Sequence, residues 1–234
     1  MNQENLKKLL FIDVQTTSSS ASYADLTPAW QKLWDEQVFR DEEIVSLSPA
    51  ERYVKKAALR AEFAKIITVS LGAILFPQGK EPLLHVRAVV GTEVDVLTRT
   101  ASAFEKFSGL VAHGGKSFDY PTLARRYLAN GLVVPKLIDS RGQKPWEITN
   151  VDTQELWRFG DSAWPSLNLL TKVLGVDVPQ KYDAEKIPEM YWSTGEKELA
   201  LKEIADYSAK EVVRTANVYV KLQEPSLSLI YQIA

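Results

Sequence analysis

Three apolar runs rich in β-branched residues lie early in the chain, and they limit the folds that it can adopt. They cover residues 9–14, 66–76 and 83–90, and the second and third are separated by a turn with proline and glycine at 77–80. Runs of this kind predict buried strands, and such a turn between two of them predicts a hairpin. We therefore expect a meander of three antiparallel strands, which helices must cover.

Helical and strand patterns alternate after this hairpin. Apolar residues at helical spacing over 94–107 lead to an expected strand at 110–113, a helix at 119–129 and a strand that ends at Asp152. Such alternation is typical of a sheet with parallel members. The sequence predicts an α/β fold with a mixed five-stranded sheet, in which the three-strand antiparallel meander is followed by parallel strands and helices flank the sheet.

Capping residues predict where further helices begin. Thr27-Pro28 and Ser48-Pro49, with Glu51 completing a capping box, indicate a helical insertion at about 27–64. Short helices are expected at 154–159 and 166–174, and a long one at 198–222. The Thr/Ser-rich residues 16–22 are expected to form a loop. We found no internal repeat, so residues 1–234 are expected to form a single domain.

Charge and cysteine content exclude several classes of protein. The 28 Lys and Arg residues against 30 Asp and Glu give no overall basic field, so nucleic acid must bind through a local patch. The lack of cysteine excludes disulfides and thiolate zinc sites and is typical of a reducing compartment. The first apolar run is too short to span a bilayer. We expect a cytoplasmic protein with no membrane partner.

Carboxylates lie at the ends of several expected elements. Asp13 breaks the first apolar run, Asp119 opens a helix, and Glu211 lies in the long helix one turn after Tyr207. Phosphodiester cleavage with two divalent metals needs carboxylates that converge from different elements, because these cations prefer oxygen ligands. These residues are therefore candidates for such a site.

Three segments resemble the motifs of the Asp-Glu-Asp-Asp exonucleases of the tyrosine subtype, which have an RNase H-like fold. They are Phe-Ile-Asp-Val-Gln-Thr at 11–16, Val-Ala-His-Gly-Gly-Lys-Ser-Phe-Asp-Tyr-Pro at 111–121 and Tyr-Ser-Ala-Lys-Glu-Val-Val at 207–213. The sequence most resembles a bacterial branch of predicted 3'-5' exonucleases related to the polymerase B exonuclease domain. Residues 57–72 and 151–160 extend the resemblance over nearly the whole chain.

The resemblance implies a role for each matching residue. Mg²⁺ or Mn²⁺ would be held by Asp13, Gln15, Asp119 and Glu211, and Tyr207 would complete the catalytic set by orienting the attacking water. The substrate, a single-stranded nucleic-acid 3' end, would contact Thr16, Thr17, His113, Lys116, Phe118 and Arg125, and Arg126 is a further candidate partner for a phosphate.

Three positions depart from the family pattern. Gln15 stands where the family has Glu, Gly114 where it has Asn, and Glu211 where it has Asp. Gln15 removes one negative charge from the expected metal site, which lowers its affinity for cations. Glu211 adds a methylene, and a misplacement of about 1 Å can cost on the order of 100-fold in rate.

Structural roles compete with the catalytic ones. Asp119 suits the start of its own helix, Tyr207 can pack its ring on the core, and His113 can be an ordinary residue at a strand end. The six Trp residues are expected to be packing residues. A charge such as that of Arg125 usually lies on a solvated face.

These observations leave three functional hypotheses. The leading one, an enzyme, is a metal-dependent 3'-5' exonuclease that acts on nucleic-acid 3' ends by two-metal hydrolysis with weakened activity. The alternative is a catalytically inactive descendant that binds nucleic acid or protein. The third is an unrelated α/β protein, for which the motif residues would not converge.

Overall fold

The computed structural model describes residues 3–193 and 195–234 of the chain. Its centre is a six-stranded sheet with the order β5-β4-β1-β2-β3-β6. The strands are β1 (Leu9–Ser18), β2 (Ala64–Leu75), β3 (Leu83–Val90), β4 (Gly109–Ala112), β5 (Val151–Asp152) and β6 (Ile230–Ile233). Strands β1, β2 and β3 pair antiparallel, whereas β4, β5 and β6 join in parallel. The predicted α/β class, meander and hairpin are confirmed.

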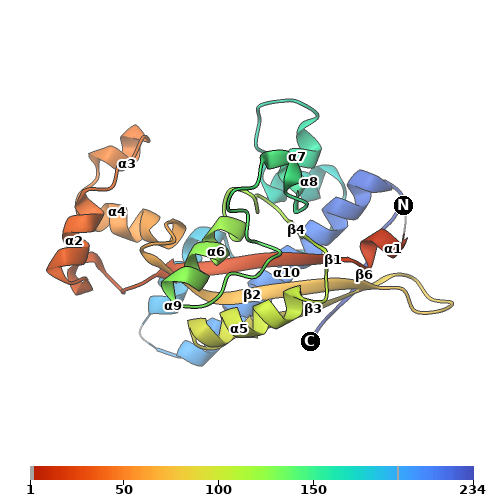
Figure 1. Cartoon of the computed structure of the whole chain (residues 1–234), viewed down its shortest axis with the longest axis horizontal. Helices are drawn as coiled ribbons and strands as arrows, with labels where there is room; N and C mark the ends of the chain where they lie inside the picture. Colours follow the sequence, from red (N-terminus) through yellow and green to blue (C-terminus); the bar gives the residue numbers. More distant parts are fainter. Residues whose placement is uncertain (1–2, 194) are drawn as a thin grey trace.

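Helices flank both faces of this sheet (Figure 1). They are α1 (Gln3–Leu6), α2 (Pro28–Asp35), α3 (Glu42–Ser46), α4 (Pro49–Lys56), α5 (Glu93–Phe104), α6 (Asp119–Ala129), α7 (Thr153–Arg158), α8 (Leu167–Val173), α9 (Ile187–Trp192) and α10 (Lys197–Gln223). Four short 3₁₀ turns cover Tyr23–Asp25, Ala57–Leu59, Pro145–Glu147 and Ala184–Lys186. No helix in the described parts of the chain has both the length and the apolar character needed to cross a membrane.

The prediction of five strands was wrong, because β6 adds a sixth at the edge of the sheet. Its four residues are all exposed, so the strand has no buried face to give an alternating pattern. It pairs in parallel with the first half of β3, from Leu83 to Val86. Parallel pairing with a distant strand leaves no hairpin turn beside it for sequence analysis to find.

The predicted loop at 16–22 was also wrong at its start. Thr16, Thr17 and Ser18 belong to β1 and are buried. A β-bulge between Gln15 and Thr16 shifts the register, and β1 then continues to pair with the start of β2 as far as Ala64. The extra residue is Ile67 of β2, because Gln15 pairs with Thr68 and Thr16 with Ile66, and the ladder continues beyond the bulge.

Two hydrophobic clusters lie on opposite faces of β1. Leu10, Ile12 and Val14 pack with residues of α5 and α6, including Leu97 and Leu123. On the other face, Phe11 packs against Val212, Val213 and Ala216 of α10. Side chains alternate between faces along a strand, so Asp13 and Gln15 share the face of Phe11 and lie on the α10 side.

Three helices separate β1 from β2 and form a group at one end of the sheet (Figure 1). The Ser48–Glu51 capping box is present at the start of α4, and Thr27 caps α2. The group has its own small core, in which the Trp34 ring makes edge contacts with Tyr53 and Phe63. The helices expected in this region are therefore present.

Candidate functional site

The site lies where β1 and β4 separate. The two strands pair only from Leu9 to Phe11 of β1, and β1 then continues alone on that side. Ligands of open α/β sheets bind at such separations, beyond the carboxyl ends of parallel strands, and we call the region around Asp13 and Asp119 the crevice. Asp13 stands at this point on β1.

Asp13 is held from two directions. Its Oδ2 accepts a hydrogen bond of 2.6 Å from Oγ of Ser208 in α10 and one of 2.8 Å from Nε2 of Gln15. Protein surrounds most of the carboxyl group, and this burial, together with the charge of Glu211, raises the pKa of Asp13 to about 7. The hydrogen bonds oppose this shift because they favour the charged form.

Asp119 reaches the same place from α6. Its Oδ1 accepts a hydrogen bond of 3.0 Å from the backbone N–H of Val14, which β4 no longer flanks. Phe118, and not Asp119, is the N-cap of α6 and makes no side-chain cap, so helix capping does not explain Asp119. Burial and then the charge of Asp13 raise the pKa of Asp119 well above its usual value.

Glu211 is bound to a buried arginine that sequence analysis did not single out. Its Oε1 accepts a hydrogen bond of 2.7 Å from Nε2 of Gln180 and one of 2.5 Å from Nη1 of Arg214. Arg214 is only 5% exposed, and its Nη2 donates to Asn168 and Thr171 of α8. Glu211 therefore faces the site with its charge already balanced by a neighbour on its own helix.

Tyr207 has its ring in the core and its hydroxyl near two carboxylates. Its ring packs against Ile67, Ile187 and Ile204. Burial, with the nearby charges of Glu211 and Asp13, raises the pKa of its hydroxyl well above the usual value. The hydroxyl therefore stays protonated at neutral pH and can donate a hydrogen bond at the edge of the acidic pair.

Gln15 lies beside Asp13 on β1 and is 9% exposed. Its amide nitrogen is used in the hydrogen bond to Asp13. A glutamate here would bring a second carboxylate to the same oxygen, and the two would repel each other unless a cation lay between them. Glutamine instead stabilises Asp13 without a cation.

The loop after β4 is tied down by Asp152. Its Oδ1 accepts from the N–H groups of Gly114 and Gln154, both at 2.9 Å, and its Oδ2 accepts from the N–H of Lys116 at 3.1 Å. These contacts use both oxygens of the carboxylate. Asp152 therefore supports the loop, and its charge is among the causes that raise the pKa of Asp119.

Gly114 occupies a left-handed backbone conformation, with φ of 71°. Glycine adopts this conformation freely, and asparagine is among the few side chains that tolerate it. The exchange of the family's Asn for Gly114 thus keeps the turn while it removes a side chain that would begin beside Gln154.

His113 is fully engaged inside the protein. Its Nδ1 lies 2.9 Å from Oγ1 of Thr153, and its Nε2 lies 3.1 Å from the carbonyl oxygen of Pro165, to which it donates. Burial lowers the pKa of the imidazole to about 4. A neutral His113 therefore braces the loops beside the crevice.

The other expected substrate contacts differ in availability. Thr16 donates to the Ala58 carbonyl, Thr17 is fully buried, Lys116 pairs with Glu155 at 2.6 Å, Phe118 is half-buried next to Asp119, Arg125 is exposed, and Arg126 pairs with Glu93 at 2.6 Å. Arg126 is thus committed to the fold. Among the described residues, the side chains of Phe118 and Arg125 make no hydrogen bond or ion pair and are at least partly exposed, whereas the Oγ1 of Thr17 has no hydrogen-bond partner but is buried.

The acidic residues fit one divalent cation better than two. Asp13 and Asp119 are neighbouring buried carboxyl groups, and burial, followed by the negative charge of nearby carboxylates, raises the pKa of each. A hard cation relieves this repulsion, and Mg²⁺ is commonly bound by one or two carboxylates together with substrate phosphates. Glu211 is already paired with Arg214. No group of three or more His, Cys, Asp or Glu side chains among the described residues could hold a metal.

The match to a family model agrees with the motifs. Residues 56–229 match the model of a family described as predicted 3'-5' exonuclease related to the exonuclease domain of PolB. One solved structure that matches is a family B DNA polymerase from the hyperthermophilic archaeon Pyrobaculum calidifontis, with 14% sequence identity and a TM-score of 0.49. The match covers 91% of this chain and 24% of the polymerase chain. No curated protein sequence matches the chain.

Proposed function

Because the chain belongs to the family of predicted 3'-5' exonucleases related to the exonuclease domain of PolB, we propose that it is a metal-dependent exonuclease of weakened activity. In this proposal, the crevice beside β1 takes the 3' end of a single-stranded nucleic acid. Hydrolysis of the terminal phosphodiester is slow because the site lacks one of the family's carboxylates.

The observation that supports this most directly is the convergence of the three motif segments. Asp13 accepts a hydrogen bond from Ser208, which follows Tyr207 in the third segment, over a separation of 195 residues. Asp119 of the second segment accepts one from Val14, beside Asp13, over 105 residues. Chance motifs on an unrelated α/β protein would not meet in this way.

In this proposal each residue of the site has a distinct role. Asp13 and Asp119 would hold one divalent cation, with the Gln15 carbonyl as a further oxygen ligand if its amide turns. A cation there would supply positive charge to the scissile phosphate. Tyr207 would donate a hydrogen bond that orients the attacking water, and the Asp152-braced loop would keep Asp119 in place. Arg214 would hold the Glu211 carboxylate in position through the hydrogen bond from its Nη1.

A second function, binding without cleavage, is favoured by two of the contacts. Gln15 satisfies Asp13 through a neutral hydrogen bond, and Arg214 satisfies Glu211. Both acids are thus stabilised without metal, which lowers the gain from binding one. A chain of this kind would still hold a strand end in the crevice.

The test is degradation of a 5'-labelled single-stranded oligonucleotide in Mg²⁺ or Mn²⁺, followed on a denaturing gel. The unmodified protein is compared with Gln15→Glu, which restores the family's carboxylate, and with Asp13→Ala. Gln15→Ala serves as a matched control, because it also removes the amide but adds no charge.

We expect slow shortening by the unmodified protein, no shortening by Asp13→Ala, and a rate increase of at least about tenfold for Gln15→Glu alone. Cleavage by Gln15→Glu only would favour the binding function. If neither the unmodified protein nor Gln15→Glu shortens the strand, the catalytic assignment of the three segments is wrong. Shortening that persists in Asp13→Ala would show that another nuclease is present.

A further inference from the structure

A second concave site lies outside the crevice, between the helices that precede β2 and helix α6. It is an open pocket of about 480 Å³. Three cationic side chains line it, Lys56 at the end of α4, Arg60 after the following 3₁₀ turn, and Arg125 on α6. Glu62 is the acidic residue of the lining. Lys56 and Arg60 are close in sequence, and the tertiary fold brings Arg125 of α6 to them.

These cations are not neutralised within the described parts of the chain. Lys56, Arg60 and Arg125 form no salt bridge there, whereas the adjacent Lys55 pairs with Glu43 at 3.1 Å and Arg126 pairs with Glu93 at 2.6 Å. The neighbouring side chains of Lys55 and Arg126 thus form ion pairs with carboxylates, whereas the three cationic side chains that line the pocket do not. The pocket therefore keeps a positive charge that Glu62 offsets only in part.

Arg60 is held in position by neutral groups. Its Nη1 donates to Oε1 of Gln37 at 3.0 Å, its Nη2 donates to the Val38 carbonyl at 2.9 Å, and its guanidinium lies 4.4 Å from the ring centroid of Phe39. Neutral acceptors and an aromatic face fix the guanidinium plane but leave its charge intact. An arginine fixed in this way loses little side-chain entropy when it binds an anion.

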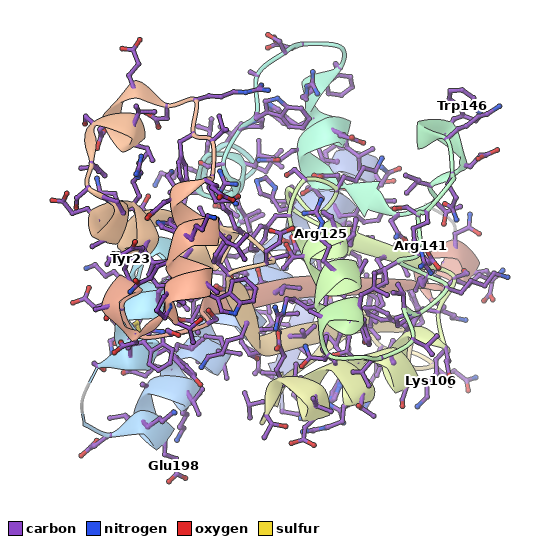
Figure 2. The ribbon with its side chains drawn as sticks, turned by 60° about the vertical axis from the view of Figure 1, so that its left-hand side comes forward. Tyr23, Lys106, Arg125, Arg141, Trp146 and Glu198 are labelled. Carbon is purple, nitrogen blue, oxygen red and sulfur yellow. The ribbon has the colours of Figure 1, made fainter. Side chains whose placement is uncertain are left out.

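The pocket is connected to the crevice through short structural links. Thr16 of β1 donates to the carbonyl of Ala58, which lies two residues before Arg60. On α6, Arg125 follows Asp119 by six residues, which corresponds to a rise of roughly 9 Å along the helix axis. Figure 2 labels Arg125 on α6. A strand whose 3' end lies against Asp119 needs only a few nucleotides to reach the pocket.

We propose that this pocket binds a backbone phosphate of the nucleic-acid strand whose 3' end occupies the crevice. The inference rests on the proposed function for the identity of the strand, while the pocket's own chemistry is that of a phosphate site. Arginine and lysine together match a phosphate, because arginine offers a fork of donors and lysine a mobile charge. The pocket thus sets a minimum strand length for tight binding.

The experiment measures binding of a 5'-fluorescein dT12 by fluorescence anisotropy in EDTA, so that no cleavage occurs, at a series of salt concentrations. The variants are Lys56→Gln, Arg125→Gln and the double variant. Lys106→Gln is the matched control, because Lys106 is an exposed lysine outside this pocket and is also labelled in Figure 2. Circular dichroism verifies that each variant is folded.

We expect the double variant to raise the dissociation constant about tenfold at low salt, and to reduce the slope of log affinity against log salt by roughly 0.7 for one lost phosphate contact. The control keeps the wild-type slope, and a dT3 probe, too short to span both sites, binds all four variants and the wild type alike. Equal slopes for dT12 in the double variant and the wild type would overturn the proposal.

A second measurement separates this inference from the proposed function. Pyrophosphate is added during thermal unfolding of the wild type and of the double variant. Stabilisation of the wild type alone supports the pocket as a phosphate site even if no strand binds, in which case the proposed function fails. The opposite result is also distinguishable. If the double variant binds dT12 as the wild type does and shows the same pyrophosphate effect, the pocket proposal fails. The proposed function still stands in that case, provided that cleavage depends on Asp13.

Discussion

Replacement of Arg214 by methionine tests whether the buried ion pair with Glu211 holds the site together. The guanidinium is 5% exposed and donates to Glu211, Asn168 and Thr171. Methionine fills a similar volume but donates nothing. The substitution therefore leaves the Glu211 carboxylate, whose side chain is 14% exposed, without its cation. It also leaves the side-chain oxygens of Asn168 and Thr171 in α8 without this donor.

The expected loss of stability follows from this geometry. Removal of one partner from a buried pair costs about 3–5 kcal/mol, because the other charge is left buried. For a chain of 234 residues, this corresponds to a fall in melting temperature of roughly 10 °C. The double variant Glu211→Gln/Arg214→Met removes the orphaned charge, so we expect it to regain about 2 kcal/mol relative to Arg214→Met alone.

The assay is urea unfolding followed by circular dichroism, with thermal melts as a second measurement. Lys210→Met is the matched control on the same helix, because Lys210 pairs with Asp206 at 2.8 Å at the surface. Exposed pairs contribute about 0–1 kcal/mol, so the control should change little. A loss below about 1 kcal/mol for Arg214→Met, or a double variant no more stable than the single one, would refute the reasoning.

Two further predictions concern the loop after β4. The pKa of His113 in the folded state is about 4, against a usual value of 6.5. Between these two pH values the unfolded chain binds a proton at this residue and the folded chain does not. The free energy of unfolding therefore falls as the pH drops from 6.5 to 4. Relative to His113→Gln, urea unfolding should show a loss of about 2–3 kcal/mol across this range in the wild type, and parallel pH profiles would contradict the assignment. At Gly114, with φ of 71°, we expect Gly114→Asn to cost less than about 1 kcal/mol and Gly114→Val about 2 kcal/mol or more, and equal urea midpoints for the two variants would disprove this backbone argument.

Local signals predicted most elements of the fold. The Ser48 capping box and the Thr27 cap marked helix starts at their observed positions, and the helix expected at 119–129 is α6, Asp119–Ala129. Helix α10 was expected at 198–222 and spans Lys197–Gln223. These features depend on backbone groups a few residues apart, which is why the local sequence contains them.

Features that depend on distant partners could not be predicted in this way. The strand character of Thr16 and Thr17 arises from pairing with β2 beyond the bulge, and β6 depends on the edge of β3. Helix α9, over Ile187–Trp192, is only six residues long and gives too few turns for a periodic signal.

In the candidate site, too, some features could be predicted from the local sequence, whereas others depend on distant partners. Its motif residues could be located from the sequence because their order and spacing resemble a family. Arg214 lies three residues after Glu211, and such a spacing on a helix was the one signal for the ion pair. The partners of Arg214 in α8, and the use of Asp152 by three backbone N–H groups, depend on tertiary contacts.

The distance along the chain between the parts of the crevice has a consequence for folding. The Asp13–Ser208 hydrogen bond closes a loop of 195 residues, and the Val14–Asp119 bond one of 105. Contacts between residues so far apart in sequence form late in folding, because the chain loses the entropy of loop closure before the contact compensates for it. The crevice is therefore absent from any partly folded state in which β1 or α10 is undocked. A ligand of the crevice should accordingly slow global unfolding and amide exchange throughout β1, and it should not protect a local region alone.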